Sequence, residues 1–472
     1  MNLSQYTKEF SKNIRLAYPV VLGMLGHTLI AIIDNIMVGK LGATELAAVS
    51  LGNSFIFVAM SFGIGFSTAI TPIVAQNDAK KDTEGVRSAF HHGLVLCSIL
   101  GISMFAVVYF CKPLMRYMGQ SEEVVNLAAP FVDVVAFSLI GVLVFQGYKQ
   151  FADGMSKTKY SMYAIIVANI VHFFINFFLI YGIWIFPKMG ILGAAIGTLF
   201  SRAIMVIMMH LMLRKDKELG QYFSGFSLRN MQKTLIKKIV AIGLPSSLIM
   251  LFEVVLFTSA VWLTGSLGKT SQAANQIALS LASMTFMVAS GLSVTAMIRV
   301  GNQKGLEAYE YLKTVARSIF LLTLLLEIGF ALIFIALHTV LPHLFLEMKN
   351  PEKLIENTEV ISIASKLLIV AALFQISDGI QAVVLGALRG LQDVKIPAVL
   401  TFISYWMVGF PICIYLGLYT DWGAVGVWTG LLIGLTVAAI LLLFRFEKLT
   451  DKLKNRKPES VEIKNVEPKT LN

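Results

Sequence analysis

The sequence predicts an all-α polytopic membrane protein with twelve membrane-spanning helices in two pseudo-symmetric bundles of six. Three observations lead to this fold class. Hydrophobic residues make up 56% of the 472 positions and charged residues only 14%, with a mean hydropathy of +0.74. The apolar residues fall into twelve long runs, and the two halves of the chain resemble each other. Because a soluble domain carries about 25% charged residues, this composition excludes soluble globular, disordered and coiled-coil proteins.

Each apolar run is long enough to cross a bilayer, which takes about 20 residues in a helix. The runs are continuous and do not show the short alternating segments of barrel strands, so they predict helices. We place the spans, in chain order, at residues 16–37, 52–76, 91–111, 126–148, 161–183, 191–213, 240–264, 276–298, 317–341, 362–388, 397–418 and 423–444.

The longest polar interruption within the chain, residues 214–238, divides the spans into two sets of six. We therefore expect an N-terminal six-helix lobe at 1–213 and a C-terminal six-helix lobe at 240–444. A cytoplasmic connector at 214–239 would join them, and a charged cytoplasmic tail would follow at 445–472.

The distribution of basic residues predicts the orientation of the chain. Of the 39 Lys and Arg residues, 30 lie on the side that holds both termini, eight lie on the other side, and Arg202 lies within a span. Basic loops stay in the cytoplasm, so we expect a multi-pass membrane protein with both termini cytoplasmic. The net charge of +11 is therefore a topology signal, and a charged fraction of 14% is too low for a nucleic-acid-binding surface.

The two halves align at an offset of 226 residues. Pro19 falls on Pro245, and Gly65 falls on Gly291. Since six spans return the chain to the side where it started, the two repeats are parallel and related by an axis along the membrane normal. Parallel repeats are typical of alternating-access transporters.

Glycines at small-xxx-small spacing predict close helix packing, which is a structural role. These are Gly193/Gly197, Gly386/Gly390 and Gly426/Gly430/Gly434.

Five carboxylates lie within the spans, namely Asp34, Asp133, Glu253, Glu327 and Asp378. An ionisable group at the bilayer centre costs roughly 2.5–3.5 kcal/mol on insertion scales, so its default interpretation is functional. We favour a function for Asp34, Glu253 and Asp378. Asp133 lies near a span start and favours an interfacial role. The roles of Glu327 and of Arg202 stay open, with a structural ion pair or carbonyl contact favoured for Arg202.

Polar neighbours support two candidate sites. Asn35 follows Asp34 and indicates a polar pocket, while Gln381 lies three residues after Asp378 on the same helical face. Carboxylate and amide oxygens suit a hard cation or a proton relay. In span five, His172 shares a face with Asn176. A buried histidine satisfied by a carbonyl and a polar clamp between helices are the alternatives for this pair.

The chain contains no catalytic constellation and no nucleotide-binding Walker motif. We therefore expect no enzyme activity, no catalytic residue and no cofactor. An ion gradient is the remaining source of energy for transport.

The chain resembles the multidrug and toxic compound extrusion (MATE) family, most closely its NorM-type bacterial branch, over residues 10–445. The resemblance rests on YPVVLGMLGHTLIAIIDNIMVGKLG in span one, GLPSSLIMLFEVVLF in span seven and SDGIQAVVLGALRGLQDVKIP at span ten. It implies two lobes around a central cleft and export of cationic amphiphilic drugs and other toxic compounds in exchange for Na⁺ or H⁺. It also implies a place in the bacterial plasma (inner) membrane, and we expect a monomer surrounded by membrane lipid.

The resemblance also implies roles for individual residues. Asp34 matches the acidic residue of span one, Glu253 the membrane Glu of span seven and Asp378 the Asp of span ten. We expect Glu253 and Asp378 to hold the coupling cation, as a candidate Na⁺ site, and Asp34 to be a second protonatable or cation-linked site. Asn176 matches a polar position of span five. Two positions depart from the family pattern: His172 stands where a polar residue, often Asn, is expected, and Phe374 stands where some members carry Tyr. The missing hydroxyl weakens the case for Na⁺, and the histidine favours proton coupling.

The sequence thus predicts a cation-coupled antiporter that exports organic cations by alternating access. A flippase for a lipid-linked saccharide has a related two-bundle architecture and is the alternative, although a pyrophosphate carrier would need a cationic cavity. The natural substrate, the choice between Na⁺ and H⁺, and the resting conformation stay open at this point.

Overall fold

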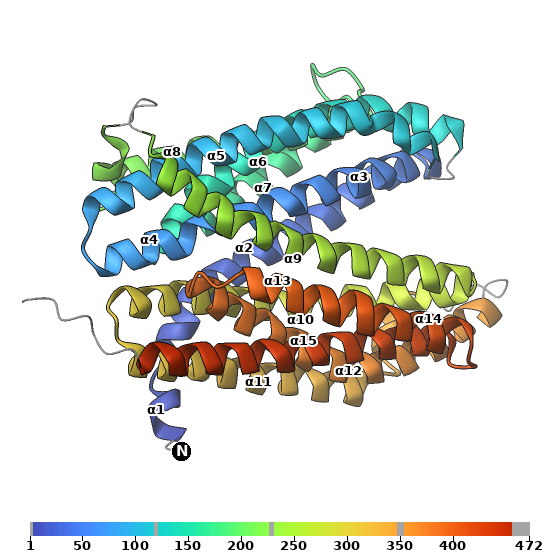
Figure 1. The fold of residues 1–472 in the computed structure, drawn as a ribbon. Helices are drawn as coiled ribbons and strands as arrows, with labels where there is room; N and C mark the ends of the chain where they lie inside the picture. The colour runs from blue at the N-terminus through green and yellow to red at the C-terminus, as the bar shows by residue number, and fades with distance from the viewer. Residues whose placement is uncertain (1–2, 118–120, 226–230, 347–353, 456–472) are drawn as a thin grey trace, which may run out of the picture.

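The computed structural model describes residues 3–117, 121–225, 231–346 and 354–455. Within these ranges the regular structure is helical, and twelve helical segments are long and apolar enough to cross a membrane. The predicted fold class is therefore confirmed. In Figure 1 the long helices run roughly side by side along one common direction.

In its described residues, the first half of the chain contains eight α-helices, of which α1 precedes the first span. They are α1 (Leu3–Thr7), α2 (Phe10–Gly39), α3 (Ala43–Ser67), α4 (Ile70–Ala79), α5 (Thr83–Cys111), α6 (Glu122–Gly154), α7 (Lys159–Tyr181) and α8 (Ile191–Lys215), with short 3-10 turns η1 (Lys112–Tyr117) and η2 (Gly220–Phe223).

The second six spans use seven α-helices and a π-helical segment. They are α9 (Lys233–Ser266), α10 (Lys269–Gly305), α11 (Tyr309–Leu337), the 3-10 turn η4 (Leu341–Leu344), α12 (Leu354–Gly390), α13 (Lys395–Phe402), the π-helix η6 (Ile403–Gly409), α14 (Phe410–Leu418) and α15 (Gly423–Lys454).

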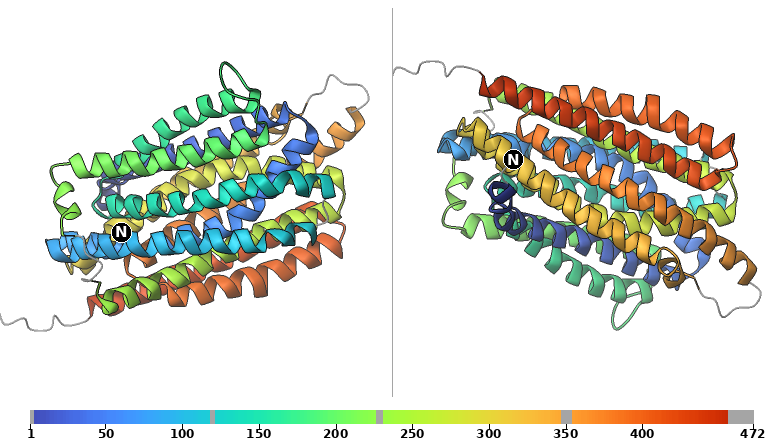
Figure 2. Two further views of the ribbon diagram at one scale, coloured as in Figure 1. Left: turned by 90° about the horizontal axis from the view of Figure 1, so that it is seen from above. Right: turned by 90° about the horizontal axis from the view of Figure 1, so that it is seen from below.

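Apart from α1, which lies beside α11, the helices of the first half occupy one side of the molecule and those of the second half the other, as Figures 1 and 2 show. The two sides meet where α3 packs on α9 and where α2 and α4 pack on α10. These contacts bring the backbone of Gly65 against Ser247, and Gln76 donates a hydrogen bond to the carbonyl of Gly390 at 3.0 Å. The two halves are thus held together by backbone-level contacts and not only by side chains.

The N-terminal arm of the first half reaches onto α10 and α11 of the second half. Arg299 donates to Glu9 at 2.5 Å and to the side-chain oxygen of Asn13, whose amide donates to Ser318 at 3.1 Å. Burial raises the pKa of Glu9, but hydrogen bonds from Arg299 and Tyr311 and the Arg299 charge outweigh it, so the pKa lies below its ordinary value. Glu9 is therefore a carboxylate at neutral pH and keeps Arg299 paired.

The glycines at small-xxx-small spacing lie at close helix contacts, as predicted. A Cβ atom on Gly430 would lie 2.4 Å from the backbone nitrogen of Cys413, and one on Gly386 would lie 2.3 Å from the carbonyl oxygen of Ser293. These positions have no room for a side chain, so α15 approaches α14, and α12 approaches α10, at backbone distance.

At two of the expected lobe boundaries a helix extends beyond the apolar span. α15 continues to Lys454, ten residues beyond the expected end of the lobe at 444. Phe446 and Thr450 are buried there, while Glu447 accepts two hydrogen bonds from Arg317 of α11, so this charged stretch packs on the bundle as an amphipathic helix. The rest of the expected tail, 456–472, lies outside the described residues. α9 begins at Lys233, seven residues before the lobe boundary expected at 240, and residues 226–230 of the connector are also outside the described ranges.

We predict that Gly430→Ala destabilises the purified protein, because its methyl group would overlap the Cys413 backbone. Overpacking of this kind costs about 1–3 kcal/mol. Gly329→Ala is the matched control, since a Cβ atom on Gly329 of α11 meets nothing within 4 Å. Alanine favours a helix over glycine by about 1 kcal/mol, so we expect unchanged or raised thermal stability for the control. Equal melting temperatures of the two variants in detergent would contradict the assignment.

Candidate functional site

Two clusters of polar side chains lie within the spans, one in each half of the molecule. The N-half cluster consists of Asp34 on α2 with His172 and Asn176 on α7. The C-half cluster consists of Glu253 on α9, Glu327 on α11, Gln375, Asp378 and Gln381 on α12, and Tyr405 on η6. Most of the residues predicted for the site belong to one of these two clusters.

The three side chains of the N-half cluster are in mutual contact. Nε2 of His172 lies 2.9 Å from both carboxylate oxygens of Asp34, and Nδ2 of Asn176 donates to Oδ1 of Asp34 at 2.8 Å. His172 and Asn176 are buried, while the Asp34 side chain is 24% exposed. A hydrogen bond between imidazole and carboxyl needs one proton between them, on either partner. A neutral imidazole that carries its proton on Nε2 therefore satisfies this geometry with an ionised Asp34.

Gly197 on α8 creates the space that Asn176 occupies. A Cβ atom on Gly197 would lie 1.7 Å from Oδ1 of Asn176, so any larger residue would displace the amide. The small-xxx-small spacing flags Gly197 in the sequence, but it indicates only close packing. The link to the N-half cluster is visible only in the structure.

Asn35 does not join the N-half cluster. Successive residues of an α-helix are rotated by about 100°, so Asn35 lies on a different face of α2 from Asp34 and is exposed. Asp34 and Asn35 are adjacent in the sequence, but their side chains do not line one pocket.

The C-half cluster contains more acid than it can neutralise through its own contacts. Asp378 is 4% exposed, and its Oδ1 atom has no hydrogen-bond partner. It interacts electrostatically with Glu253 and with Glu327. Glu253 interacts electrostatically with the guanidinium group of Arg389. Arg389 lies on α12, about four helix turns after Gln375. One guanidinium cannot balance three carboxylates, so this cluster favours additional cations.

Glu327 was left open in the sequence, and the structure places it beside the predicted pair. It is 1% exposed, neither carboxylate oxygen has a hydrogen-bond partner, and its side chain packs where a Cβ atom on Gly379 would be, within 2.8 Å. The signal for Glu327 in the sequence is only its depth within an apolar run, which does not show which helix it faces.

Tyr405 is the second C-half residue that sequence reasoning missed. It is fully buried, its hydroxyl has no hydrogen-bond partner, and it interacts electrostatically with Glu253 and Asp378. It lies in the π-helical segment η6, a rare distortion that recurs at functional sites. Phe374 packs edge-on against Trp428 at a ring distance of 5.2 Å. The phenol absent at position 374 is thus available from a different helix.

The remaining C-half oxygens suit a small hard cation. Oε1 of Gln375 is buried without a partner, and Gln381 is 1% exposed with its amide nitrogen free of partners. Within the described residues, no three His, Cys, Asp or Glu side chains are arranged around one metal position. A cation in this cluster would therefore use Glu253 and Asp378 together with uncharged amide and hydroxyl oxygens.

Two other charged residues within the spans have structural partners. Asp133 pairs with Lys112 at 2.6 Å at the edge of the bundle, in keeping with an interfacial role. Arg202 donates to the Ser138 hydroxyl at 2.6 Å. Both contacts tie helices of the first half together and lie outside the two clusters.

Comparison with known proteins assigns the fold and the family. The MatE family model matches residues 19–178 and again residues 245–415, so both matches begin at the prolines aligned by the internal repeat. The chain is 31% identical to the probable multidrug resistance protein NorM of Rhizobium meliloti (strain 1021), over 94% of this chain and 95% of that protein. It is 32% identical to the multidrug resistance protein MdtK of Yersinia pestis (strain Pestoides F), over 95% and 97% of the two chains.

A solved structure supports the same fold. The outward-facing form of a multidrug resistance MATE family transporter of the MOP superfamily superposes with a TM-score of 0.82, at 22% identity, over 94% of this chain and 96% of that chain. The matched proteins are named for multidrug resistance and transport, in line with the expectation that the chain is not an enzyme. With its twelve spans, its internal repeat and these matches, the chain belongs to the MATE family of multidrug efflux transporters.

Proposed function

We propose that this transporter exports organic cations and other cationic amphiphiles in exchange for a coupling cation, H⁺ or Na⁺. The observation that carries the proposal is the C-half cluster, where Asp378 on α12 and Glu327 on α11 are buried with carboxylate oxygens that lack hydrogen-bond partners. Asp378 also interacts electrostatically with the half-buried Glu253. Buried ionised groups without partners are costly. Binding of a cation to Glu253 and Asp378 removes that cost, which makes the cluster a cation site.

In this mechanism Glu253 on α9 and Asp378 on α12 form the main coupling site. Glu253 is half-buried and Asp378 is buried, so an ion can enter from the Glu253 side. The uncharged oxygens of Gln375 and Tyr405 complete a cation environment that accepts Na⁺ as well as a proton. Gln381 supports the site as a neighbouring polar group on the same helix.

The N-half cluster is a second, proton-binding site. Asp34 already has two partners, His172 and Asn176, so it has less need of an added metal ion. Protonation changes which of the imidazole and the carboxyl donates, and with it the contact between α2 and α7. Since α2 also packs on α10 of the other half, a change at Asp34 reaches the interface between the halves.

Alternating access follows from the placement of the contacts between the halves. The contacts of Gln76 with Gly390 and of Glu9 with Arg299 lie toward the end of the bundle that holds the N-terminus, whereas Gly65 meets Ser247 near the middle of α9. If that end is cytoplasmic, as the basic residues favour, this arrangement is an outward-facing state of a protein of the bacterial inner membrane. Rocking of the halves would break these contacts and open the other side. One chain contains both halves, so a monomer is sufficient.

We predict that Glu253→Gln and Asp378→Asn each reduce ethidium efflux from intact cells by about ten-fold, a typical size for the coupling between two ligand sites. Both substitutions keep the shape of the side chain and remove its charge. The matched control is Asp421→Asn, which removes an exposed carboxylate between α14 and α15. Wild-type efflux in both site variants, at equal membrane expression, would refute the C-half coupling site.

We also predict that His172→Asn weakens drug transport driven by a pH gradient more than transport driven by a Na⁺ gradient. Asparagine can donate to Asp34, but it cannot exchange a proton with it. The measurement is drug uptake into proteoliposomes with each gradient imposed separately. Asn35→Ala serves as the control, because this residue lies outside the cluster. Equal losses under both gradients, or none, would show that His172 takes no part in proton coupling.

A further inference from the structure

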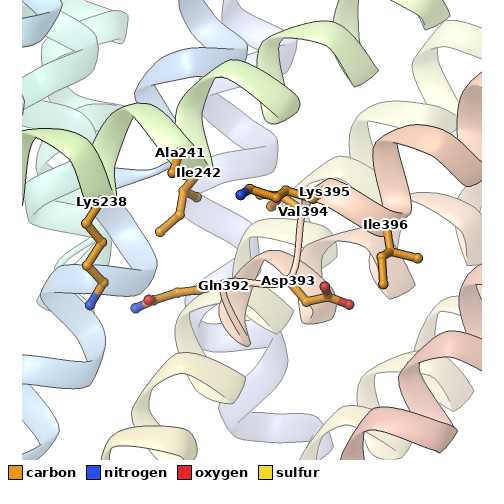
Figure 3. Close-up of a pocket in the computed structure, with 8 residues that line it drawn as sticks. All are labelled: Lys238, Ala241, Ile242, Gln392, Asp393, Val394, Lys395 and Ile396. Carbon is orange, nitrogen blue, oxygen red and sulfur yellow. The ribbon is translucent and has the colours of Figure 1, made fainter.

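A pocket of about 400 Å³ lies at the end of the bundle that holds the N-terminus, apart from both polar clusters. It is formed by Lys238, Ala241 and Ile242 of α9, by the turn Gln392–Val394 and by the first residues of α13. Figure 3 shows the side chains of Lys238 and Gln392 extending toward one another, whereas Asp393 extends in the opposite direction.

The pocket is basic, and its positive charges are not neutralised by the protein. Among the described residues, neither Lys238 nor Lys395 has an ion-pair partner. Lys80, Lys238 and Lys304 are close enough to repel one another electrostatically. The carboxylate that lines the pocket, Asp393, is held by Arg445 through two hydrogen bonds of 2.7 and 3.2 Å. An anion in the pocket would relieve the repulsion.

Gln392 adds a hydrogen-bond donor without a partner. Its Nε2 atom is buried and has no acceptor within the structure. The residue also has a φ of 58°, in the left-handed region that a non-glycine residue adopts at a cost. A phosphate group could accept hydrogen bonds from the Gln392 amide and from the ammonium groups of Lys238 and Lys395.

Exposed apolar side chains continue from the pocket along the neighbouring helix surface. Ile396, Val399 and Ile403 follow one face of α13 and η6, and Leu244 lies one helix turn beyond the pocket on α9. α9 and α13 lie side by side, with the rings of Phe252 and Phe402 5.1 Å apart. A free phosphate ion would not cover this surface, whereas a ligand with apolar chains would.

We propose that this pocket binds the phosphate headgroup of an anionic phospholipid, with its acyl chains along the exposed face of α13. Basic pockets between membrane helices are suited to anionic lipid headgroups. Lys80 follows α4 of the first half, while Lys238 and Lys395 belong to the second half. The pocket itself is lined by residues of the second half, and a lipid bound there offsets the repulsion between Lys238 and Lys80 of the first half.

The test uses the full-length protein purified in detergent and counts bound lipids by native mass spectrometry. We expect dioleoylphosphatidylglycerol to bind more tightly than dioleoylphosphatidylcholine. Each lysine near an anionic headgroup contributes to binding, so Lys238→Gln with Lys395→Gln should weaken phosphatidylglycerol binding by about ten-fold or more. The charge-preserving pair Lys238→Arg with Lys395→Arg should retain it.

The matched control is Lys448→Gln with Lys452→Gln, which removes two exposed charges of α15 at the same end of the molecule. This control should bind phosphatidylglycerol like the wild type. Two results would overturn the proposal: equal phosphatidylglycerol affinity in the Lys238/Lys395 glutamine variant and the wild type, or displacement of the lipid by millimolar inorganic phosphate, which would indicate a free-anion site. Since the assay involves no transport, its outcome is independent of the coupling mechanism.

Discussion

The cost of an unpaired charge in an apolar interior is the constraint on which this structure depends. The two halves of the internal repeat satisfy this constraint in different ways. In the first half Asp34 is satisfied by His172 and Asn176 within the protein. In the second half Asp378 and Glu327 have oxygens without partners. The first cluster can rest without an added ion, whereas the second requires a bound cation or a proton. The two halves therefore differ in whether their buried carboxylates need a bound cation.

Close packing positions the groups that meet this constraint. Gly197 makes room for the Asn176 amide, and Gly379 makes room for the Glu327 side chain. The π-helical segment changes the helical register and brings Tyr405 toward Glu253 and Asp378. Small residues in a membrane bundle allow helices to approach, and here the same approach determines which polar atoms meet. Packing and chemistry are therefore specified by the same positions.

At the end of the bundle that holds the N-terminus, the interface between the halves contains both acidic and basic side chains. Arg299 of α10 is paired with Glu9 of the N-terminal arm, so this contact is internally neutral. The lysines around the pocket near Gln392 are not balanced in this way. A transporter that rocks must break its closing contacts in each cycle, so neither type can be very strong. A bound anionic lipid would place part of the closing interaction under the control of the membrane.

The sequence by itself determined the number of spans, the internal repeat, and the position of Asp34, Glu253 and Asp378 within the spans, because apolar runs and isolated charges are local properties of the chain. It also placed His172 and Asn176 on one face of a helix through their spacing of four. The tertiary structure decided that this face meets Asp34, 138 residues away from His172. It also decided that Asn35 turns aside and that Glu327 and Tyr405 approach Asp378. Periodicity fixes the polar face of each helix, but the neighbour of that face depends on packing between distant helices, which no local pattern records.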